Sequence, residues 1–214
     1  MLSRNRASLS VVLGSLLIVA IALPAQAALP VRNPPCGKVV TKSFKLGGNM
    51  DCTGDGLVVG KAGITIHLNG KRIRGDGDAD DYGILNEAGY ADVTVRNGRV
   101  VDFDDGIRIE GALRNTIRRV RANNNASDGL EVNGGRKHHV RFVIADGNGD
   151  DGIDVGANRS VILDSKTRNN GEDGIDVAGN DNVLRRNYAC GNALSNYDLS
   201  GTFISTKNTE DAAC

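Results

Sequence analysis

The sequence is poor in aromatic residues. Phe, Tyr and Trp together make up 4% of the chain, and Trp is absent. Sugar-binding grooves commonly place the faces of sugar rings on aromatic side chains, so this composition argues against a deep catalytic groove for sugars. No Ser-His-Asp or Cys-His arrangement of a nucleophilic enzyme stands out, and only three His are present. The composition therefore leaves enzymatic activity undecided and favours binding or structure over catalysis.

The chain also lacks an excess of either charge. Lys and Arg together number 26, and Asp and Glu together number 26 as well. No basic stripe with interleaved aromatic residues is visible along the sequence, so we do not expect nucleic acid as a partner. The length suits one domain.

Long hydrophobic runs are absent except near the N-terminus, where residues 11–23 are apolar. Arg4 and Arg6 precede this run, and Ala-Gln-Ala follows it at residues 25–27. The pattern is typical of a secretory signal, and the run is shorter than the roughly 20 residues that a membrane span requires. We therefore expect residues 1–27 to be removed, leaving a secreted or periplasmic monomer without a membrane span.

Cysteine is scarce, with four residues, and all of them follow the expected cleavage site. An even number in an exported protein suggests disulfide bonds, and four cysteines allow three connectivities. Pairing Cys36 with Cys52 and Cys190 with Cys214 would staple the two ends, and closing a loop of about 15 residues stabilises by roughly 3 kcal/mol. A metal site is the alternative, but the Cys-x-x-Cys spacing of such sites is missing.

A short glycine-containing unit is what the sequence has in abundance. Its glycines, at positions 83, 106, 129, 152 and 174, are separated by 23, 23, 23 and 22 residues. A fixed period in this range is the signature of a solenoid. In units such as Gly-Ile-Asp-Val the two aliphatic residues are two positions apart, so they face the same side of a strand. We expect one interior row, formed by Ile107, Leu130, Ile153 and Ile175.

Each period predicts one turn of a coil, made of two or three short strands joined by polar corners. Stacked turns would pair in parallel, and Asn residues in aligned corners would hydrogen-bond to those above and below. The prediction is an all-β solenoid of about seven turns. A leucine-rich repeat has a similar period, but it requires a Leu-x-x-Leu-x-Leu frame and usually a helical side, and neither is present.

From about Cys36 to Cys214 the chain resembles the right-handed parallel β-helix proteins of the pectin-lyase-like superfamily. The resemblance is carried by Cys36-Gly37, by Cys52, by the run Ile-Thr-Ile-His-Leu-Asn-Gly at 64–70 and by the Asp-Gly-Ile repeats. It implies a single right-handed coil. The expected boundaries are a signal peptide at 1–27, an N-terminal cap at 28–55, the β-helix at 56–199 and a C-terminal cap at 200–214.

Two groups of acidic residues are candidate calcium sites. Asp76, Asp78 and Asp80 alternate within a loop insertion, as they do in calcium loops of the Asp-x-Asp-x-Asp kind. The second group would form a column along the coil and consists of Asp151, Asp154, Asp173 and Asp176. In the pectate lyases that the fold resembles, acidic groups on an outer strand face bind calcium that bridges an acidic sugar. The alternative for both groups is a solvated acidic surface, and the Asp before each glycine could simply cap its turn.

A basic segment, Arg136-Lys137-His138-His139 with Arg141 close behind, is the third candidate. There His139 could act as a general base and Arg141 could hold a uronate carboxylate, with Asp154 as a further catalytic candidate. The alternative is that these are ordinary surface residues.

Taken together, the sequence favours an exported β-helix that binds acidic polysaccharide or a surface glycan, with calcium as a candidate cofactor. Cleavage or epimerisation of the polysaccharide is the less favoured variant. The alternative is a non-catalytic structural or surface-interaction solenoid, because a fold does not by itself determine a function.

Overall fold

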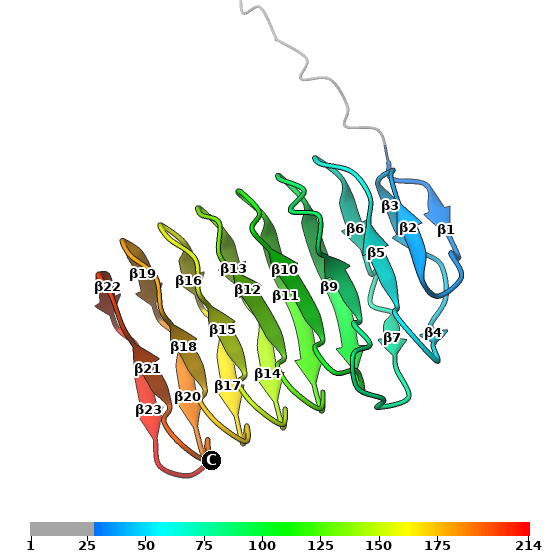
Figure 1. Cartoon of the computed structure of the whole chain (residues 1–214). Helices are drawn as coiled ribbons and strands as arrows, with labels where there is room; N and C mark the ends of the chain where they lie inside the picture. The colour runs from blue at the N-terminus through cyan, green and yellow to red at the C-terminus, as the bar shows by residue number, and fades with distance from the viewer. Residues whose placement is uncertain (1–27) are drawn as a thin grey trace, which may run out of the picture.

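The computed structural model describes residues 28–214; the expected signal sequence, residues 1–27, lies outside the described residues. The described chain winds into an all-β coil of about eight turns, and equivalent strands of successive turns pair in parallel (Figure 1). Each complete turn contributes strands to three faces, which we call faces 1, 2 and 3 in chain order. No helix in the described part is long and apolar enough to cross a membrane.

Face 1 is an eight-stranded parallel sheet that carries the repeated Gly-Ile-x-Val unit. Its strands are β2 (Lys38–Val40), β5 (Leu57–Val59), β8 (Ile84–Asn86), β10 (Ile107–Glu110), β12 (Leu130–Asn133), β15 (Ile153–Val155), β18 (Ile175–Val177) and β21 (Tyr197–Leu199).

Faces 2 and 3 belong to a second sheet, because the long strands β9 (Thr94–Val101) and β11 (Thr116–Asn123) run across both. The other strands of face 2 are β1 (Val31–Arg32), β3 (Phe44–Leu46), β6 (Thr65–His67), β13 (His139–Arg141), β16 (Val161–Leu163), β19 (Asn182–Arg185) and β22 (Phe203–Thr206). The other strands of face 3 are β4 (Met50–Asp51), β7 (Arg72–Arg74), β14 (Ile144–Asp146), β17 (Lys166–Arg168), β20 (Tyr188–Cys190) and β23 (Thr209–Asp211).

A single residue in the left-handed conformation turns the chain from face 2 to face 3. Successive turns place Asn69, Asn97, Arg119, Phe142, Asp164, Arg186 and Lys207 at this corner, with φ between 53° and 59°. The left-handed region is uncommon for residues other than Gly, Asn and Asp, so each corner is held by the ladders on both sides of it. The position itself is never glycine in these seven turns, although Gly70 after Asn69 is left-handed as well.

The interior row expected from the repeat is confirmed. Ile107 pairs with Leu130, Leu130 with Ile153, and Ile153 with Ile175, and none of these side chains is more than 1% exposed. Since each turn is too thin to bury its aliphatic side chains alone, burial depends on the turns above and below.

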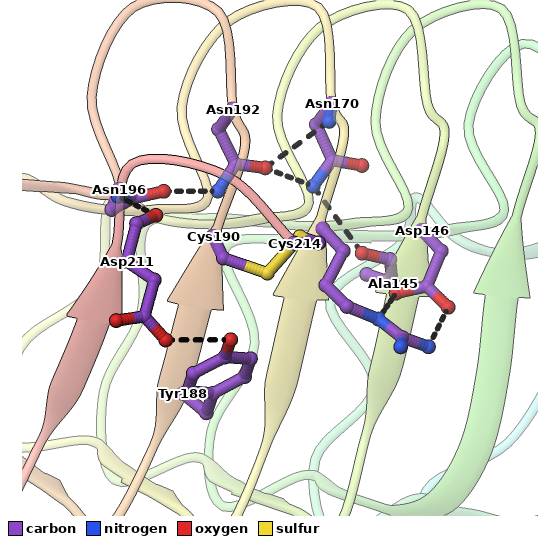
Figure 2. The surroundings of a disulfide bond; sticks show 10 residues. Ala145, Asp146, Asn170, Tyr188, Cys190, Asn192, Asn196, Asp211 and Cys214 are labelled. Atoms are coloured by element: carbon purple, nitrogen blue, oxygen red, sulfur yellow. Dashed lines mark hydrogen bonds and ion pairs between the residues drawn. A yellow bond between two sulfur atoms is a disulfide. The ribbon is translucent and has the colours of Figure 1, made fainter.

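An asparagine ladder stabilises the corner between faces 3 and 1. The side-chain oxygen of Asn148 accepts the backbone N–H of Asn125, and that of Asn170 accepts the N–H of Asn148. Asn192 continues the series, and Asn170 also donates to the carbonyl of Ala145 (Figure 2). Because the corner is buried, these amides satisfy backbone groups that water cannot reach.

The coil has about eight turns rather than the seven expected, because the two stretches expected as caps continue it. Residues 28–55 contribute β1 to β4, and residues 200–214 contribute β22 and β23. The expected disulfides are confirmed as Cys36–Cys52 and Cys190–Cys214. Figure 2 shows the second bridge beside the hydrogen bond from Tyr188 to Asp211, so the chain end is attached to the last turn.

Candidate functional site

The outer surface of face 2 carries a file of basic residues, one from each of five successive turns. Strand register aligns Lys45 with His67, His67 with Arg96, Arg96 with Arg118, and Arg118 with Arg141. We call these five residues the basic file. Parallel strands lie roughly 4.8 Å apart, so the file extends over about 19 Å along the coil.

The charges of the basic file are not neutralised by the rest of the described chain. No ion pair joins Lys45, Arg96, Arg118 or Arg141 to a carboxylate within residues 28–214, whereas seven other arginines there do form ion pairs. Burial, followed by the charges of Arg96, Arg119 and Arg141, lowers the pKa of Arg118 below its ordinary value. Like charges held this close favour a bound anion.

His67 is a neutral member of the basic file. The backbone N–H of Asn69 donates to its Nδ1 at 2.8 Å, and the side-chain amide of Asn97 lies 3.2 Å from its Nε2. Burial, then the charge of Arg96, lowers the pKa of His67 below 6.5. The positive charge at neutral pH therefore comes from the lysine and the three arginines.

A cavity of about 420 Å³ opens on the basic file. Its wall includes Lys45, Arg96 and Arg118 and the threonines that precede the file on two strands, Thr65 and Thr94. This volume lies in the range of small-ligand sites, and the lining combines charged and hydroxyl donors. The cavity can hold one anionic unit of a larger ligand.

An exposed aromatic residue, Phe142, lies at the corner between faces 2 and 3, directly after Arg141. Its ring is approached by the guanidinium carbons of Arg119 and Arg141, each 5.6 Å from the ring centroid. The side chain is 42% exposed and has φ of 54°, which is strained for a bulky residue. The same corner borders a hollow of about 330 Å³ that Arg99 and Arg121 also line. An exposed ring among cations suits a ligand that is both anionic and partly apolar.

Face 1 presents a second ladder, made by the Asp that precedes each repeat glycine. The Oδ1 atom of Asp105 accepts the backbone N–H of Asp128, Asp128 accepts that of Asp151, and Asp151 accepts that of Asp173. Ser195 continues the series by donating its N–H to Asp173 at 2.6 Å. One oxygen of each carboxylate is therefore used in holding neighbouring turns together, and not within its own turn.

Arg108 fills the tightest acidic cluster. Among the described residues, Asp105, Asp128 and Glu131 are the one group of three acids whose ligand atoms all lie within 4.8 Å of one another. The Arg108 Nη1 atom lies 3.0 Å from Asp105 and 2.6 Å from Glu131, the latter at ion-pair distance but without hydrogen-bond alignment. Tyr82 stacks on the guanidinium at 5.3 Å. The guanidinium pairs with two of the three acids, Asp105 and Glu131, so it already occupies the place that a metal ion would take.

Beyond Arg108 the acidic column continues, and no ion pair within residues 28–214 involves Asp154, Asp176 or Asp198. Asp154 pairs in register with Asp176, and Asp176 with Asp198. Burial raises the pKa of Asp154 to about 7, aided by the charges of Asp176 and Asp151, and burial raises that of Asp151 to about 6. Burial raises the pKa of Asp128 further, to about 8.

The acidic loop is exposed and makes local hydrogen bonds. Asp76 accepts the backbone N–H of Asp78 at 3.3 Å, and the N–H of Asp80 reaches Asp104 at 3.2 Å. Calcium binding there, as at Asp151, Asp154, Asp173 and Asp176, stays a prediction.

The three catalytic candidates do not converge. His139 and Arg141 are on β13 of face 2, whereas Asp154 is on β15 of face 1. His138, the neighbour of His139, is fully buried inside the coil. His139 and Arg141 are exposed on the same side of β13, so Asp154 cannot act on a substrate bound there, and a catalytic role for His139 and Arg141 stays a prediction.

Sequence reasoning found Arg141 but missed Lys45, Arg96 and Arg118. These residues do not form a visible stripe along the sequence, because they are 22 or more positions apart. A signal did exist: Thr94-Val95-Arg96, Thr116-Ile117-Arg118 and His139-Val140-Arg141 recur with nearly the same period as the glycines. Comparing outward positions between turns would have shown the stripe.

Comparison with known families agrees with this architecture. A family model described as right handed beta helix region matches residues 50–210, well over half of the chain. The protein therefore belongs to the right-handed β-helix family. No curated protein and no solved structure matches the chain. The two disulfides are compatible with an extracellular or periplasmic location.

Proposed function

We propose that this protein binds acidic polysaccharide along face 2, with the basic file as the contact surface. The observation that supports this proposal is the alignment of Lys45, Arg96, Arg118 and Arg141 without ion-pair partners among residues 28–214. Arginine holds carboxylate or sulfate groups through two parallel hydrogen bonds, which makes it suited to a ligand bearing either group.

A linear chain fits this surface better than a compact anion. Arg96, Arg118 and Arg141 recur at roughly 4.8 Å, close to the advance of one sugar ring in an extended polysaccharide. Each anionic group that faces the coil would then meet one of these arginines. The exposed Phe142 ring, beside Arg141, offers an apolar surface to the face of a sugar.

Binding without cleavage is the form of the proposal that the geometry supports. The acidic candidate Asp154 lies on face 1 and the basic file on face 2. A polysaccharide on face 2 would therefore meet cations and hydroxyl groups, but not a carboxylate and a base together. Calcium at the acidic loop or column would act away from this surface. Calcium binding at the loop is tested by the rise in melting temperature on adding calcium, which the variant Asp76→Asn, Asp78→Asn, Asp80→Asn should lose.

The test compares polymers of equal length and different charge. Polygalacturonate, a sulfated glycan, a neutral glucan and single-stranded DNA are each titrated into the protein by calorimetry at two salt concentrations. The acidic glycans should bind, more weakly at high salt, and the neutral glucan should not. The triple variant Arg96→Gln, Arg118→Gln, Arg141→Gln should lose at least tenfold in affinity for them.

Arg159→Gln is the matched control, because Arg159 is exposed and its charge is paired with Asp181 on a different corner. This variant should bind as the unmodified protein does, with the same far-ultraviolet spectrum. Failure of every acidic glycan to bind would overturn the proposal and leave the structural solenoid. Tighter binding of DNA than of any glycan would also overturn it.

A further inference from the structure

The first described residues lie beside the basic file. The backbone N–H of Lys45 donates to the carbonyl of Pro30 at 2.8 Å, and that of Gly47 to the carbonyl of Arg32 at 2.9 Å. The chain is therefore fixed from Pro30 onward. Ala28, only two residues before this anchor, has little freedom to move away.

Ala28 and Leu29 form part of the wall of the 420 Å³ cavity, together with Lys45, Arg96 and Arg118. Every heavy atom of an alanine is within three bonds of its nitrogen. The nitrogen of Ala28 is therefore close to the cavity whichever of its atoms lines it.

We infer that removal of residues 1–27 completes an anion subsite, because the new α-ammonium group of Ala28 joins Lys45, Arg96 and Arg118 around this cavity. The inference rests on the proposed function and on the cleavage expected after Ala27. The ligand of the subsite is the terminal carboxylate- or sulfate-bearing sugar of an acidic polysaccharide. Before cleavage the same nitrogen is an amide, which carries no charge.

The subsite would distinguish a chain end from the middle of a chain. The wall of the cavity spans four turns, from Lys45 to Arg118, or roughly 14 Å along the coil, so the end of the ligand would fill it and the following sugars would reach Arg141. An α-ammonium group has three donors and is charged at neutral pH, since its ordinary pKa is about 8. It would contribute one more charge-assisted hydrogen bond to the end sugar, whereas Arg141, farther along the file, would contact any part of the chain.

The experiment removes the positive charge of the N-terminus by acetylating it. A fusion protein is cut immediately before Ala28, and half of it is acylated at mildly acidic pH, where an α-amino group reacts before lysines do. Mass spectrometry confirms acetylation at Ala28 alone. Tetragalacturonate is titrated into both forms, into Arg118→Gln and into Arg159→Gln, each checked for an unchanged melting temperature. N-terminal sequencing of the exported protein establishes where cleavage occurs.

We expect acetylation to weaken tetragalacturonate binding about tenfold, the size of one charge-assisted hydrogen bond. Arg118→Gln should weaken it similarly, and Arg159→Gln should not. If Arg118→Gln weakens binding and acetylation does not, the N-terminal inference is wrong while the proposed function stands. If the unacetylated protein binds neither tetragalacturonate nor any of the acidic glycans of the first test, both are wrong. An exported protein that begins elsewhere than Ala28 also overturns the inference.

Discussion

The guanidinium of Arg108 lies 2.6 Å from the carboxylate of Glu131, a residue that it meets only because β10 and β12 are in register. The same group bonds Asp105 at 3.0 Å, and these three side chains are 29% exposed or less. Arg108 therefore neutralises a partly buried acidic cluster formed by two turns of the coil.

Replacing Arg108 by Leu should destabilise the protein by about 3 kcal/mol, because removing one partner leaves buried carboxylates uncompensated. Urea unfolding followed by circular dichroism measures the loss. The double variant Arg108→Leu, Glu131→Leu should recover part of it. Equal stability of Arg108→Leu and the unmodified protein would show that water solvates the cluster.

Asn148 is a central member of the asparagine ladder, and its loss should affect three turns at once. Its amide accepts from Asn125 and donates to Ala122 and Asn170. Asn148→Ala leaves several buried groups without partners, so we expect a loss of about 3 kcal/mol. Asn133→Ala, at an exposed position, is the control and should change stability by less than about 0.5 kcal/mol. A similar effect of both variants would contradict the role assigned to the ladder.

Asp154 should make the protein less stable at alkaline than at acidic pH. Its pKa is raised to about 7 by burial, Asp176 and Asp151, so its contribution to stability is full below about pH 4. That contribution is lost as pH rises through 7, when the folded protein must ionise the group. Asp154→Asn should therefore be more stable than the unmodified protein by about 2 kcal/mol at pH 8, and equal to it at pH 4. Melting temperatures across pH 4–8 test this, and parallel curves for the two proteins would refute it.

His138 should have the opposite pH dependence. Burial lowers its pKa to about 4, so its contribution is full above about pH 6.5 and is lost as pH falls toward 4. The full effect is about 3 kcal/mol. Asn115, His138, Ser160 and Asn182 occupy equivalent positions in successive turns. The side-chain oxygen of Asn182 accepts the backbone N–H of Ser160, and the hydroxyl of Ser160 accepts that of His138. His138→Asn should supply the same kind of cap and be more stable than the unmodified protein at pH 4.5. A histidine resonance titrating near pH 6.5 and assigned to His138 would contradict this prediction.

Leu163 pairs in register with Arg141 on one side and with Arg185 on the other. It therefore separates the basic file, which ends at Arg141, from the next cation, Arg185. Leu163→Arg should join the two and extend the row of cations by two turns. We expect tighter binding of polygalacturonate longer than about six sugars, and little change for tetragalacturonate. Calorimetry with a length series measures this, and Leu163→Gln controls for the loss of the apolar side chain. An equal gain for the short oligosaccharide would show that the added charge acts only through the general field.

Much of the fold could be predicted, since the repeated aliphatic pairs specify the interior independently of the corners. The row from Ile107 to Ile175 and both disulfides agree with the prediction. The number of turns was underestimated because the terminal turns contain β2 and β22 without the Asp-Gly-Ile unit. The asparagine ladder was expected in outline, and the structure decides that Asn125 is its member in the turn before Asn148.

The candidate site was predictable only in part. Arg141 was singled out for its neighbours in sequence, yet the residues that it acts with, Arg96 and Arg118, are neighbours only through the ladder. His138 was expected among exposed basic residues. Alternation along β13 directs His139 outward and Val140 inward. His138 is two positions before Val140, so it points inward as well.

The sequence alone determined a stacked coil with an aliphatic interior, because side-chain alternation along a strand has a local period of two. The tertiary structure decided which outward side chains meet, because that depends on register across turns of 22 or 23 residues. Corners of different length still bring equivalent positions together, since 29 residues separate His67 from Arg96 but 22 separate Arg96 from Arg118. The alignment of Arg96, Arg118 and Arg141, and the insertion of Arg108 among three carboxylates, are therefore properties of the folded protein.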